Sequence, residues 1–245
     1  MNYTDLFTKG AEGCLYSLFY HVWPWMGLGA AVVLFILIFF SNNLRSDINK
    51  PRMKDPAILA WLGVLVYLLH NFEEFGLDLY GNQLGFTYIV NGIVNARATE
   101  GLTLGCNLAL IWIAFPLAAY LVQRGRTRMT AALACFSLLN STGHIMQGII
   151  FGMYNPGLLN SALLCWPLGI WTLYVCSKYE KQNKSLFVKL FLSAVAYHII
   201  LIAAGVGLKL GMSEFWQTII LLADACLIFY LWILSSKTKP KSNSN

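Results

Sequence analysis

One histidine and two adjacent glutamates interrupt a stretch of the sequence that is otherwise apolar. His70, Glu73 and Glu74 lie within the run AILAWLGVLVYLLHNFEEFGLDLYG, residues 57–81. On a helix, residues at i, i+3 and i+4 share a face, so the three side chains fall within an arc of about 100°. A carboxylate at the centre of a bilayer costs roughly 2.5–3.5 kcal/mol. Two of them need a cationic partner, a shared proton or a metal ion, so this motif predicts a functional site.

A second polar group lies in the apolar stretch 129–153. Asn140, His144 and Gln147 follow helical spacing and again share one face. Ionisable groups within a membrane almost always point into the helix bundle. The two polar faces are therefore expected to meet inside the protein.

Other apolar stretches bring polar groups to the same depth. His70, His144 and His198 each follow a basic residue at the start of their stretch by a similar number of residues. At about 1.5 Å per residue, the three histidines lie at similar heights, in the outer half of the bilayer. Asn107 and Asp224 reach a comparable depth from the opposite side. Five helices are thus expected to contribute to one polar layer.

The composition is that of a polytopic membrane protein. The 245 residues are 58% hydrophobic and 11% charged, whereas a soluble domain carries about 25% charged residues. The net charge of +6 comes mainly from the connections between apolar stretches. No basic stripe interleaved with aromatic residues is present, which argues against nucleic-acid binding. The sequence also contains no nucleotide-binding or haem motif.

Seven apolar stretches are long enough to cross a bilayer of about 30 Å as helices. They cover residues 20–41, 57–79, 100–122, 129–153, 157–176, 186–208 and 216–235. Lysine and arginine are concentrated after the first, third, fifth and seventh stretches, so the positive-inside rule predicts an outer N-terminus and a cytoplasmic C-terminus. We expect an all-α, seven-helix bundle in the cell (inner or plasma) membrane.

Two further segments complete this organisation. A single transmembrane domain is expected over residues 1–235, followed by a basic cytoplasmic tail at 236–245. The segment 80–99 is too polar to span the membrane. It is expected to lie at the outer interface as a re-entrant or amphipathic segment that closes over the site.

Three motifs occur in order along the chain. HxxEE at 70–74, NxxxH at 140–144 and Tyr154-Asn155-Pro156-Gly157 together resemble the HXXEE-domain family of bacterial integral membrane proteins. The resemblance covers the central stretches, residues 57–176. It implies that the polar motifs are catalytic, but it implies no particular reaction or substrate.

The residue types suit metal-dependent chemistry. Imidazoles and carboxylates bind zinc or iron, and catalytic zinc typically has three protein ligands. His70, His144 and one glutamate would make such a set. We assign Glu74 as the ligand, although the sequence allows Glu73 equally well. The other glutamate would serve as general base. His198 or Asp224 is expected to complete or orient the ligand shell.

The expected function is that of an integral membrane enzyme, a metal-assisted hydrolase or transferase acting on an amphiphilic or lipid-like substrate. Asn140 is expected to orient His144 or to bind substrate. Substrate contacts are expected from four other polar residues, Asn107, Gln147, Tyr154 and Asp224. Two alternatives stay open. Adjacent carboxylates can share a proton, which would suit a metal-free isomerase or cyclase, or a proton-coupled transporter that loads Glu73 and Glu74. The oligomeric state is not indicated.

Overall fold

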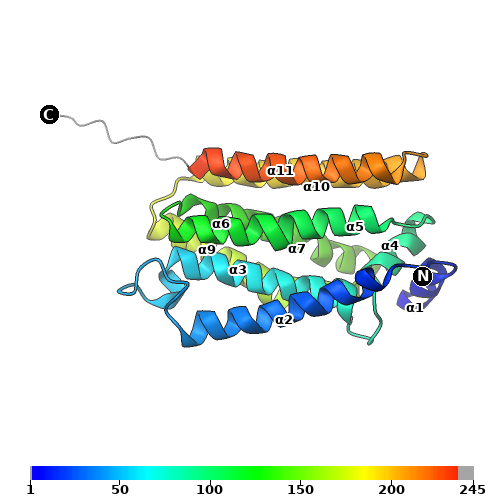
Figure 1. Cartoon of the computed structure of the whole chain (residues 1–245), viewed down its shortest axis with the longest axis horizontal. Coiled ribbons are helices and arrows are strands. Elements are labelled where there is room, and N and C mark those ends of the chain that lie inside the picture. Colours follow the sequence, from blue (N-terminus) through cyan, green and yellow to red (C-terminus); the bar gives the residue numbers. More distant parts are fainter. Residues whose placement is uncertain (1, 237–245) are drawn as a thin grey trace.

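The computed structural model describes residues 2–236, and all regular structure in that range is helical. The long helices run side by side along the longest axis of the molecule (Figure 1). In chain order the elements are α1 (Tyr3–Ala11), α2 (Leu18–Phe40), η1 (Arg52–Lys54), α3 (Pro56–Asn71), η2 (Phe72–Gly76), α4 (Gly85–Val94), α5 (Glu100–Asn107), η3 (Leu108–Ala114), α6 (Phe115–Gln123), α7 (Arg128–Phe151), α8 (Leu158–Asn160), η4 (Ser161–Cys165), α9 (Trp166–Lys178), α10 (Lys184–Lys209) and α11 (Glu214–Ser236). Apart from Ser236, the predicted basic tail lies outside the described residues.

Six helices of the described chain are long and apolar enough to cross a membrane. They are Leu18–Phe40, Pro56–Gly76, Glu100–Gln123, Leu158–Lys178, Lys184–Lys209 and Glu214–Ser236. They correspond to six of the seven predicted stretches. The remaining stretch, 129–153, forms α7, a helix of 24 residues, whose polar run from Asn140 to Gln147 lowers its apolar character. Six helices thus support an all-helical, membrane-spanning architecture. The helix α7 is long enough but not apolar enough to be counted with them.

The helix α3 forms the centre of the bundle. Within its apolar window 78% of the residues are buried, against 33% or fewer in the other five spans. It begins at Pro56, where Asp55 caps it by accepting the backbone N–H of Ala57. It packs against α2, α6, α7 and α9. The helix that carries His70 is therefore the one most completely enclosed by protein.

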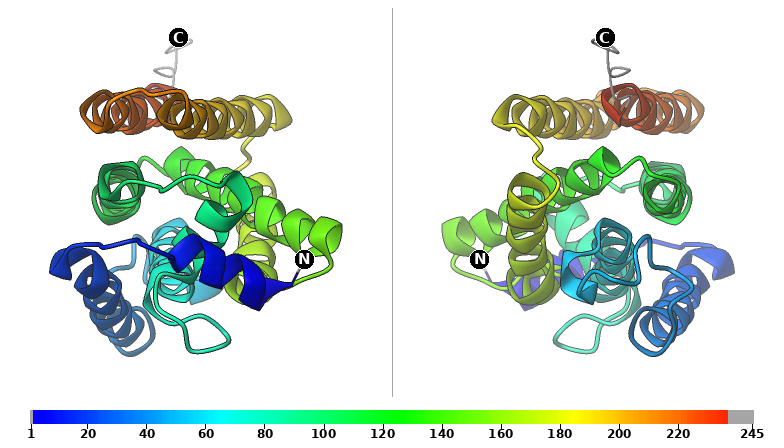
Figure 2. Two further views of the ribbon diagram at one scale, coloured as in Figure 1. Left: turned by 90° about the vertical axis from the view of Figure 1, so that its right-hand side faces the viewer. Right: turned by 90° about the vertical axis from the view of Figure 1, so that its left-hand side faces the viewer.

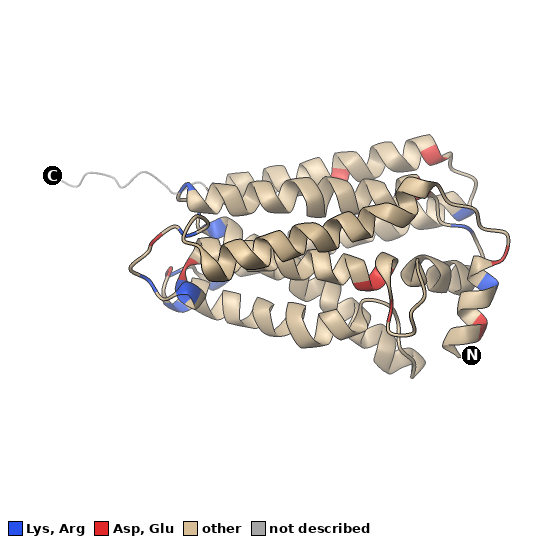
Figure 3. Ribbon diagram, turned by 60° about the horizontal axis from the view of Figure 1, so that its bottom comes forward, with Lys and Arg blue, Asp and Glu red and all other residues tan. Residues whose placement is uncertain are grey.

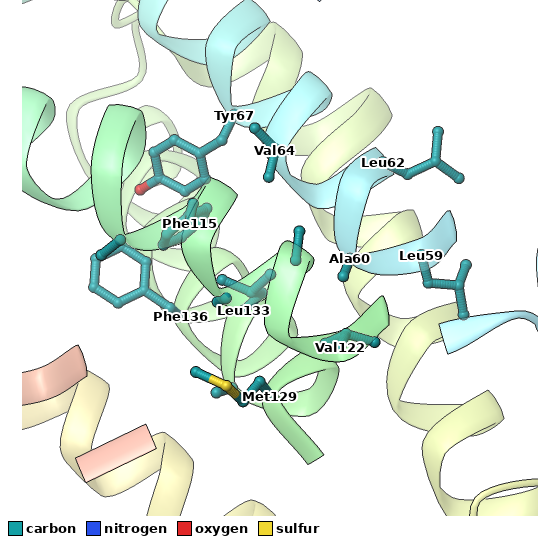
Figure 4. Packing of buried hydrophobic residues seen from close by; sticks show 14 of the residues in the cluster. Leu59, Ala60, Leu62, Val64, Tyr67, Phe115, Val122, Met129, Leu133 and Phe136 are labelled. Atoms are coloured by element: carbon teal, nitrogen blue, oxygen red, sulfur yellow. The ribbon is translucent and has the colours of Figure 1, made fainter. Parts of the chain in front are cut away.

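Aromatic residues fill the space between α3, α6 and α7. Tyr67 projects from α3 toward Phe115 and Phe136 (Figure 4). The ring centroids of Tyr67 and Phe115 are 5.2 Å apart, and those of Phe115 and Phe136 are 5.6 Å apart. These edge-to-face contacts have the geometry that aromatic pairs prefer. These packed aromatic rings lie next to the polar residues at the end of α3.

Two helices form a layer along one side of the bundle. α10 and α11 lie side by side (Figure 2), and both pack on α7. At one end of the bundle, basic residues gather in the connections (Figure 3). There Lys50 forms an ion pair with Glu180 at 2.9 Å, which ties the connection after α2 to the one after α9.

The opposite end is covered by the short helices α1 and α4, which pack together across it (Figure 2). Their backbones come very close, because a Cβ atom on Gly10 would lie 1.7 Å from the carbonyl oxygen of Tyr88. The hydroxyl of Tyr3 donates a short hydrogen bond to the buried carboxylate of Asp78. The segment 80–99 does not span the bundle. It contains α4, consistent with the interfacial segment that its polarity predicts.

Candidate functional site

The motif HxxEE lies where α3 changes from an α-helix to a π-helix. His70 is in the last turn of α3, and Glu73 and Glu74 belong to the π-helical turn η2. In that turn the backbone N–H of Leu77 donates to the carbonyl of Phe72 at 3.0 Å. π-helical turns inside α-helices are rare and frequently occur at functional sites. Further π-helical turns, η3 and η4, follow Asn107 and Asn160.

Three buried side chains converge at the end of α3. Oε1 of Glu74 lies 3.5 Å from Nε2 of His70 and 3.2 Å from Nε2 of His144. One candidate ligand atom from each of the three residues lies within 4.8 Å of the others. The predicted meeting of the two polar faces is thus found, and it selects Glu74 as the carboxylate between the histidines.

Asn155 fixes the ring of His144. Its Oδ1 atom lies 2.7 Å from Nδ1 of His144, and its Nδ2 donates to the carbonyl oxygen of His144 at 2.9 Å. The second bond sets the amide so that its oxygen faces the ring. The ring hydrogen of neutral His144 therefore lies on Nδ1, and the lone pair of Nε2 points toward Glu74. An outer residue that orients a histidine in this way is typical of metal sites.

Gly157 closes the space beside the two rings. Its backbone has a φ of +96°, a conformation that glycine adopts without strain. A Cβ atom at this position would lie 2.8 Å from Cε1 of both His70 and His144. The motif Tyr154–Gly157 therefore supplies one residue that orients the histidines and one that makes room for them.

Glu73 has a different environment from Glu74. Its Oε1 accepts the hydroxyl of Tyr154 and the backbone N–H of Leu159, each at 3.0 Å. Its Oε2 accepts the backbone N–H of Asn160 at 2.7 Å. These amides are unpaired donors at the start of the helix Leu158–Lys178, where a carboxylate is stabilising. Glu73 therefore joins two helices as a capping residue.

Tyr154 lies between Glu73 and the loop after η2. Its hydroxyl also accepts the backbone N–H of Leu79 at 3.1 Å. Burial, together with the nearby carboxylate of Glu73, raises the pKa of Tyr154 above its usual value. The hydroxyl stays protonated and remains a hydrogen-bond donor to Glu73.

Asn140 connects the cluster to His198. Its Nδ2 lies 3.1 Å from Nε2 of His70, and its Oδ1 lies 3.4 Å from Nε2 of His198. Because an amide nitrogen only donates, Nε2 of His70 accepts this bond. The ring hydrogen of neutral His70 therefore lies on Nδ1. The structure places His198 next to Asn140 rather than among the three possible metal ligands.

A cavity of about 630 Å³ lies beside the cluster, a volume suited to a small-molecule ligand. Glu74, Asn140 and His198 contribute polar atoms to its wall, and Asn107 lines it as well. Most of the remaining wall is apolar or aromatic. Four apolar lining residues are between 39% and 66% exposed, namely Ile93 and Val94 of α4 and Ile202 and Val206 of α10. These exposed side chains place the opening of the cavity between α4 and α10.

Three of the predicted substrate-binding residues lie away from the cavity wall. Tyr154 contacts Glu73 instead. Gln147 is exposed near the end of α7, as are Met146, Ile149 and Ile150. Asp224 is buried in α11, and its Oδ2 has no hydrogen-bond partner among the described residues. Helical spacing gives the direction of such side chains but not which neighbouring helix covers them.

The three side chains could hold a metal ion, since one ligand atom from each lies within 4.8 Å of the others. Zinc bonds of about 2.0–2.2 Å in tetrahedral geometry hold ligand atoms about 3.3 Å apart, close to the 3.2 and 3.5 Å between Glu74 and the two rings. The lone pairs of both Nε2 atoms and a carboxylate oxygen face one another. Such an arrangement of acceptors is stabilised by a cation or by a shared proton. For His70 to serve as a ligand through Nε2, the amide of Asn140 must turn away.

Comparison with known proteins agrees with the motifs. Residues 61–172 match the family model described as "Protein of unknown function with HXXEE motif". No curated protein and no solved structure matches the chain. The matched range contains all the residues that form the cluster and its supports, from His70 to Asn160. The chain thus matches the HXXEE family over this segment.

Proposed function

We propose that this protein is a membrane-embedded enzyme in which His70, Glu74 and His144 hold a zinc or iron ion. The reaction we assign to it is hydrolysis or group transfer on an amphiphilic substrate that enters the cavity. One observation carries the proposal: two imidazole nitrogens and a carboxylate oxygen converge within 4.8 Å, and the same Glu74 lines an apolar cavity of about 630 Å³.

The proposal includes the topology of the chain. We place seven helices across the cell membrane, counting α7, with the N-terminus outside and the C-terminus in the cytoplasm. Two observations support this. α7 packs against α3, α9, α10 and α11, and its polar residues Ser141 and His144 are buried by protein. The basic residues gather at one end of the bundle (Figure 3), as the positive-inside rule requires of a cytoplasmic end. The cluster then lies nearer the outer surface.

The polar residues of the site would have different roles in catalysis. A bound zinc or iron ion would polarise a carbonyl or phosphoryl oxygen of the substrate. Asn155 orients His144, and Glu73 fixes the helix start that carries Asn155 and Gly157 close to the rings. Asn140 and His198 line the cavity, where they can donate to or accept from a bound substrate. The apolar walls exclude water from the acyl or isoprenoid chain.

A second candidate function has its own support. The Asn140 amide occupies the Nε2 lone pair of His70, and Nε2 of His144 lies close enough to Glu74 to share a proton. That pair could act as an acid and a base without a metal, as in an isomerase or cyclase. Replacing Asn140 with alanine distinguishes the metal-dependent function from the acid–base function. If His70 is a ligand, Asn140→Ala should bind metal as tightly as the wild type or more tightly. If the chemistry is acid–base alone, neither the wild type nor Asn140→Ala should bind metal.

The enzymatic assignment is tested by activity assays on detergent-purified protein. The probes are 4-nitrophenyl decanoate and 4-nitrophenyl decyl phosphate, each with protein stripped of metal and then resupplied with zinc or ferrous ion. We expect release of 4-nitrophenol only from the resupplied protein, and none from Glu74→Gln. Equal rates in all samples would contradict the proposal. Activity that is equal in metal-free and resupplied protein but is lost in Glu74→Gln would favour the acid–base function.

A further inference from the structure

The wall of the cavity carries two basic residues at its outer end. Arg97 lies in the connection between α4 and α5, and Lys209 is the last residue of α10. Both line the cavity and both are exposed. Among the residues that the structure describes, Glu74 is the one acidic residue that lines this cavity. The cavity is thus positively charged at one end and carries its reactive carboxylate further in.

The two cations are held in place without neutralising partners. The guanidinium of Arg97 donates to the carbonyl of Leu15 at 2.6 Å and lies 5.1 Å from the ring centre of Tyr16. Nζ of Lys209 donates to the carbonyl of Val94 at 3.1 Å. Neither forms an ion pair with a carboxylate of the described chain. These contacts orient both side chains but leave their charges unpaired.

Basic residues are scarce at this end of the bundle. The segments of the described chain around the cluster, which include α1, the connections 77–99 and 152–157 and the turn after α10, contain three lysines and arginines, Lys9, Arg97 and Lys209. The remaining described ones gather toward the opposite end (Figure 3). Two of the three line the cavity. Their position is therefore not explained by the topology, which disfavours positive charge on the outer side.

We propose that Arg97 and Lys209 form a subsite for the anionic head group of a single-chain amphiphile, a phosphate or a carboxylate. The hydrocarbon chain would then lie along the apolar walls and pass Glu74, Asn140 and His198. Arginine and lysine bind such oxygens through charge-assisted hydrogen bonds. A cationic head group would be repelled at this position. The inference rests on the proposed function only in taking the cavity as the substrate site, and it names the class of substrate.

The test compares head groups on one chain length. Binding of dodecyl phosphate, dodecanoate and dodecanol to the full-length protein in a neutral maltoside detergent is measured from the concentration dependence of the thermal unfolding midpoint. The variants are Arg97→Gln, Lys209→Gln and the double substitution. Lys184→Gln, at the other end of α10, is the matched control, and Arg97→Lys tests whether charge alone restores binding.

We expect both anionic probes to bind the wild-type protein more tightly than dodecanol. Each neutral variant should weaken anion binding about threefold to fivefold, since a partly exposed charge pair contributes modestly. Lys184→Gln and Arg97→Lys should bind as the wild type does. Tighter binding of dodecyl phosphate than of dodecanoate would identify a phosphate head group, and the reverse order a carboxylate. Equal binding of dodecanol and the anions, or no effect of the double substitution, would overturn the inference.

Metal analysis of the same samples separates this inference from the proposed function. Selective anion binding by protein that holds no metal would refute the metal-dependent mechanism and leave the head-group subsite standing. Metal bound at the cluster without selectivity for anions would refute the head-group subsite and leave the metal-dependent mechanism standing. The His144→Ala variant should lose metal and still bind dodecyl phosphate or dodecanoate with the wild-type preference.

Discussion

Oε1 of Glu74 lies 3.2 Å from Nε2 of His144, although the two residues come from different helices. The backbone of neither helix forces this contact. It depends on the π-helical turn η2, on the amide of Asn155 and on the absence of a side chain at Gly157. The turn η2 and the motif 154–157, both within residues 61–172, therefore combine to bring one carboxylate oxygen between two imidazoles.

The two adjacent glutamates should respond differently to the same substitution. Glu74→Gln should abolish metal binding, because it removes the negative ligand atom. Glu73→Gln should retain metal but destabilise the fold by about 1–3 kcal/mol, since the partly buried backbone amides of Leu159 and Asn160 lose a charged acceptor. Metal analysis and denaturant unfolding of both variants measure this. Loss of metal in both, with equal loss of stability, would show that the glutamates are not divided in this way.

Helical periodicity and the cost of burying charge in a membrane were sufficient to predict much of the site. They identified His70, Glu74 and His144 as residues of one inward layer. They assigned His198 and Asn107 to the same layer, and in the structure both residues line the adjacent cavity. Both rules act on each helix separately. They predict which residues must avoid lipid, and the bundle satisfies them at His70, Glu74 and His144 but not at Gln147.

The separate roles of the glutamates could not be predicted from the same rules. Glu73 and Glu74 both lie on the inward arc of an ideal helix. Which one meets the histidines depends on the π-helical turn and on where the helix Leu158–Lys178 begins, and both are products of tertiary packing. Asn155 belongs to a sequence motif, but its role as a partner of His144 follows only from the tertiary structure. Gln147 kept the predicted spacing but has no helix packed over it.

Gly157 should be indispensable for the cluster. Gly157→Ala would introduce a left-handed alanine, costing about 1–2 kcal/mol, and would push a Cβ atom against both rings, 2.8 Å from Cε1 of each. Gly152→Ala is the matched control, because Gly152 also has a positive φ, 60°, while a Cβ there meets no atom of the described chain within 4 Å. Both variants should lose stability, Gly157→Ala more because of the clash, and only Gly157→Ala should lose metal. Normal metal content in Gly157→Ala would argue against the packing described here.

Asn155 should control metal affinity without being a ligand. Asn155→Ala frees the ring of His144 to rotate and to change tautomer, and loss of such an orienting residue typically weakens metal binding about 10–100-fold. Competition with a zinc chelator measures the affinity. Asn160→Ala, close along the chain and with a side-chain oxygen that has no partner in the described chain, should bind metal as the wild type does. Similar affinities in the two variants would refute the role of Asn155.

The contact between Tyr3 and Asp78 predicts a loss of stability at alkaline pH. Burial, and then the carboxylate of Asp78, raise the pKa of Tyr3 above its usual value of 10.0. A group whose pKa is higher in the folded state stabilises the fold below its unfolded pKa, and this contribution is lost as the pH rises beyond about 10. Thermal unfolding between pH 8 and 11 should show a smaller decrease for Tyr3→Phe than for the wild type. The exposed Tyr120→Phe should behave as the wild type; identical slopes for all three proteins would contradict the prediction.

The measurement that tests the central claim most directly is the metal content of the purified protein by inductively coupled plasma mass spectrometry. Wild type is compared with His144→Ala, and with His198→Ala as the control histidine that lies in the cavity wall but outside the ligand group. We predict close to one zinc or iron ion per chain in the wild type and in His198→Ala, and none in His144→Ala. Absence of metal from the wild type after supplementation with zinc and ferrous ion, or equal metal content in all three proteins, would contradict a metal centre at His70, Glu74 and His144.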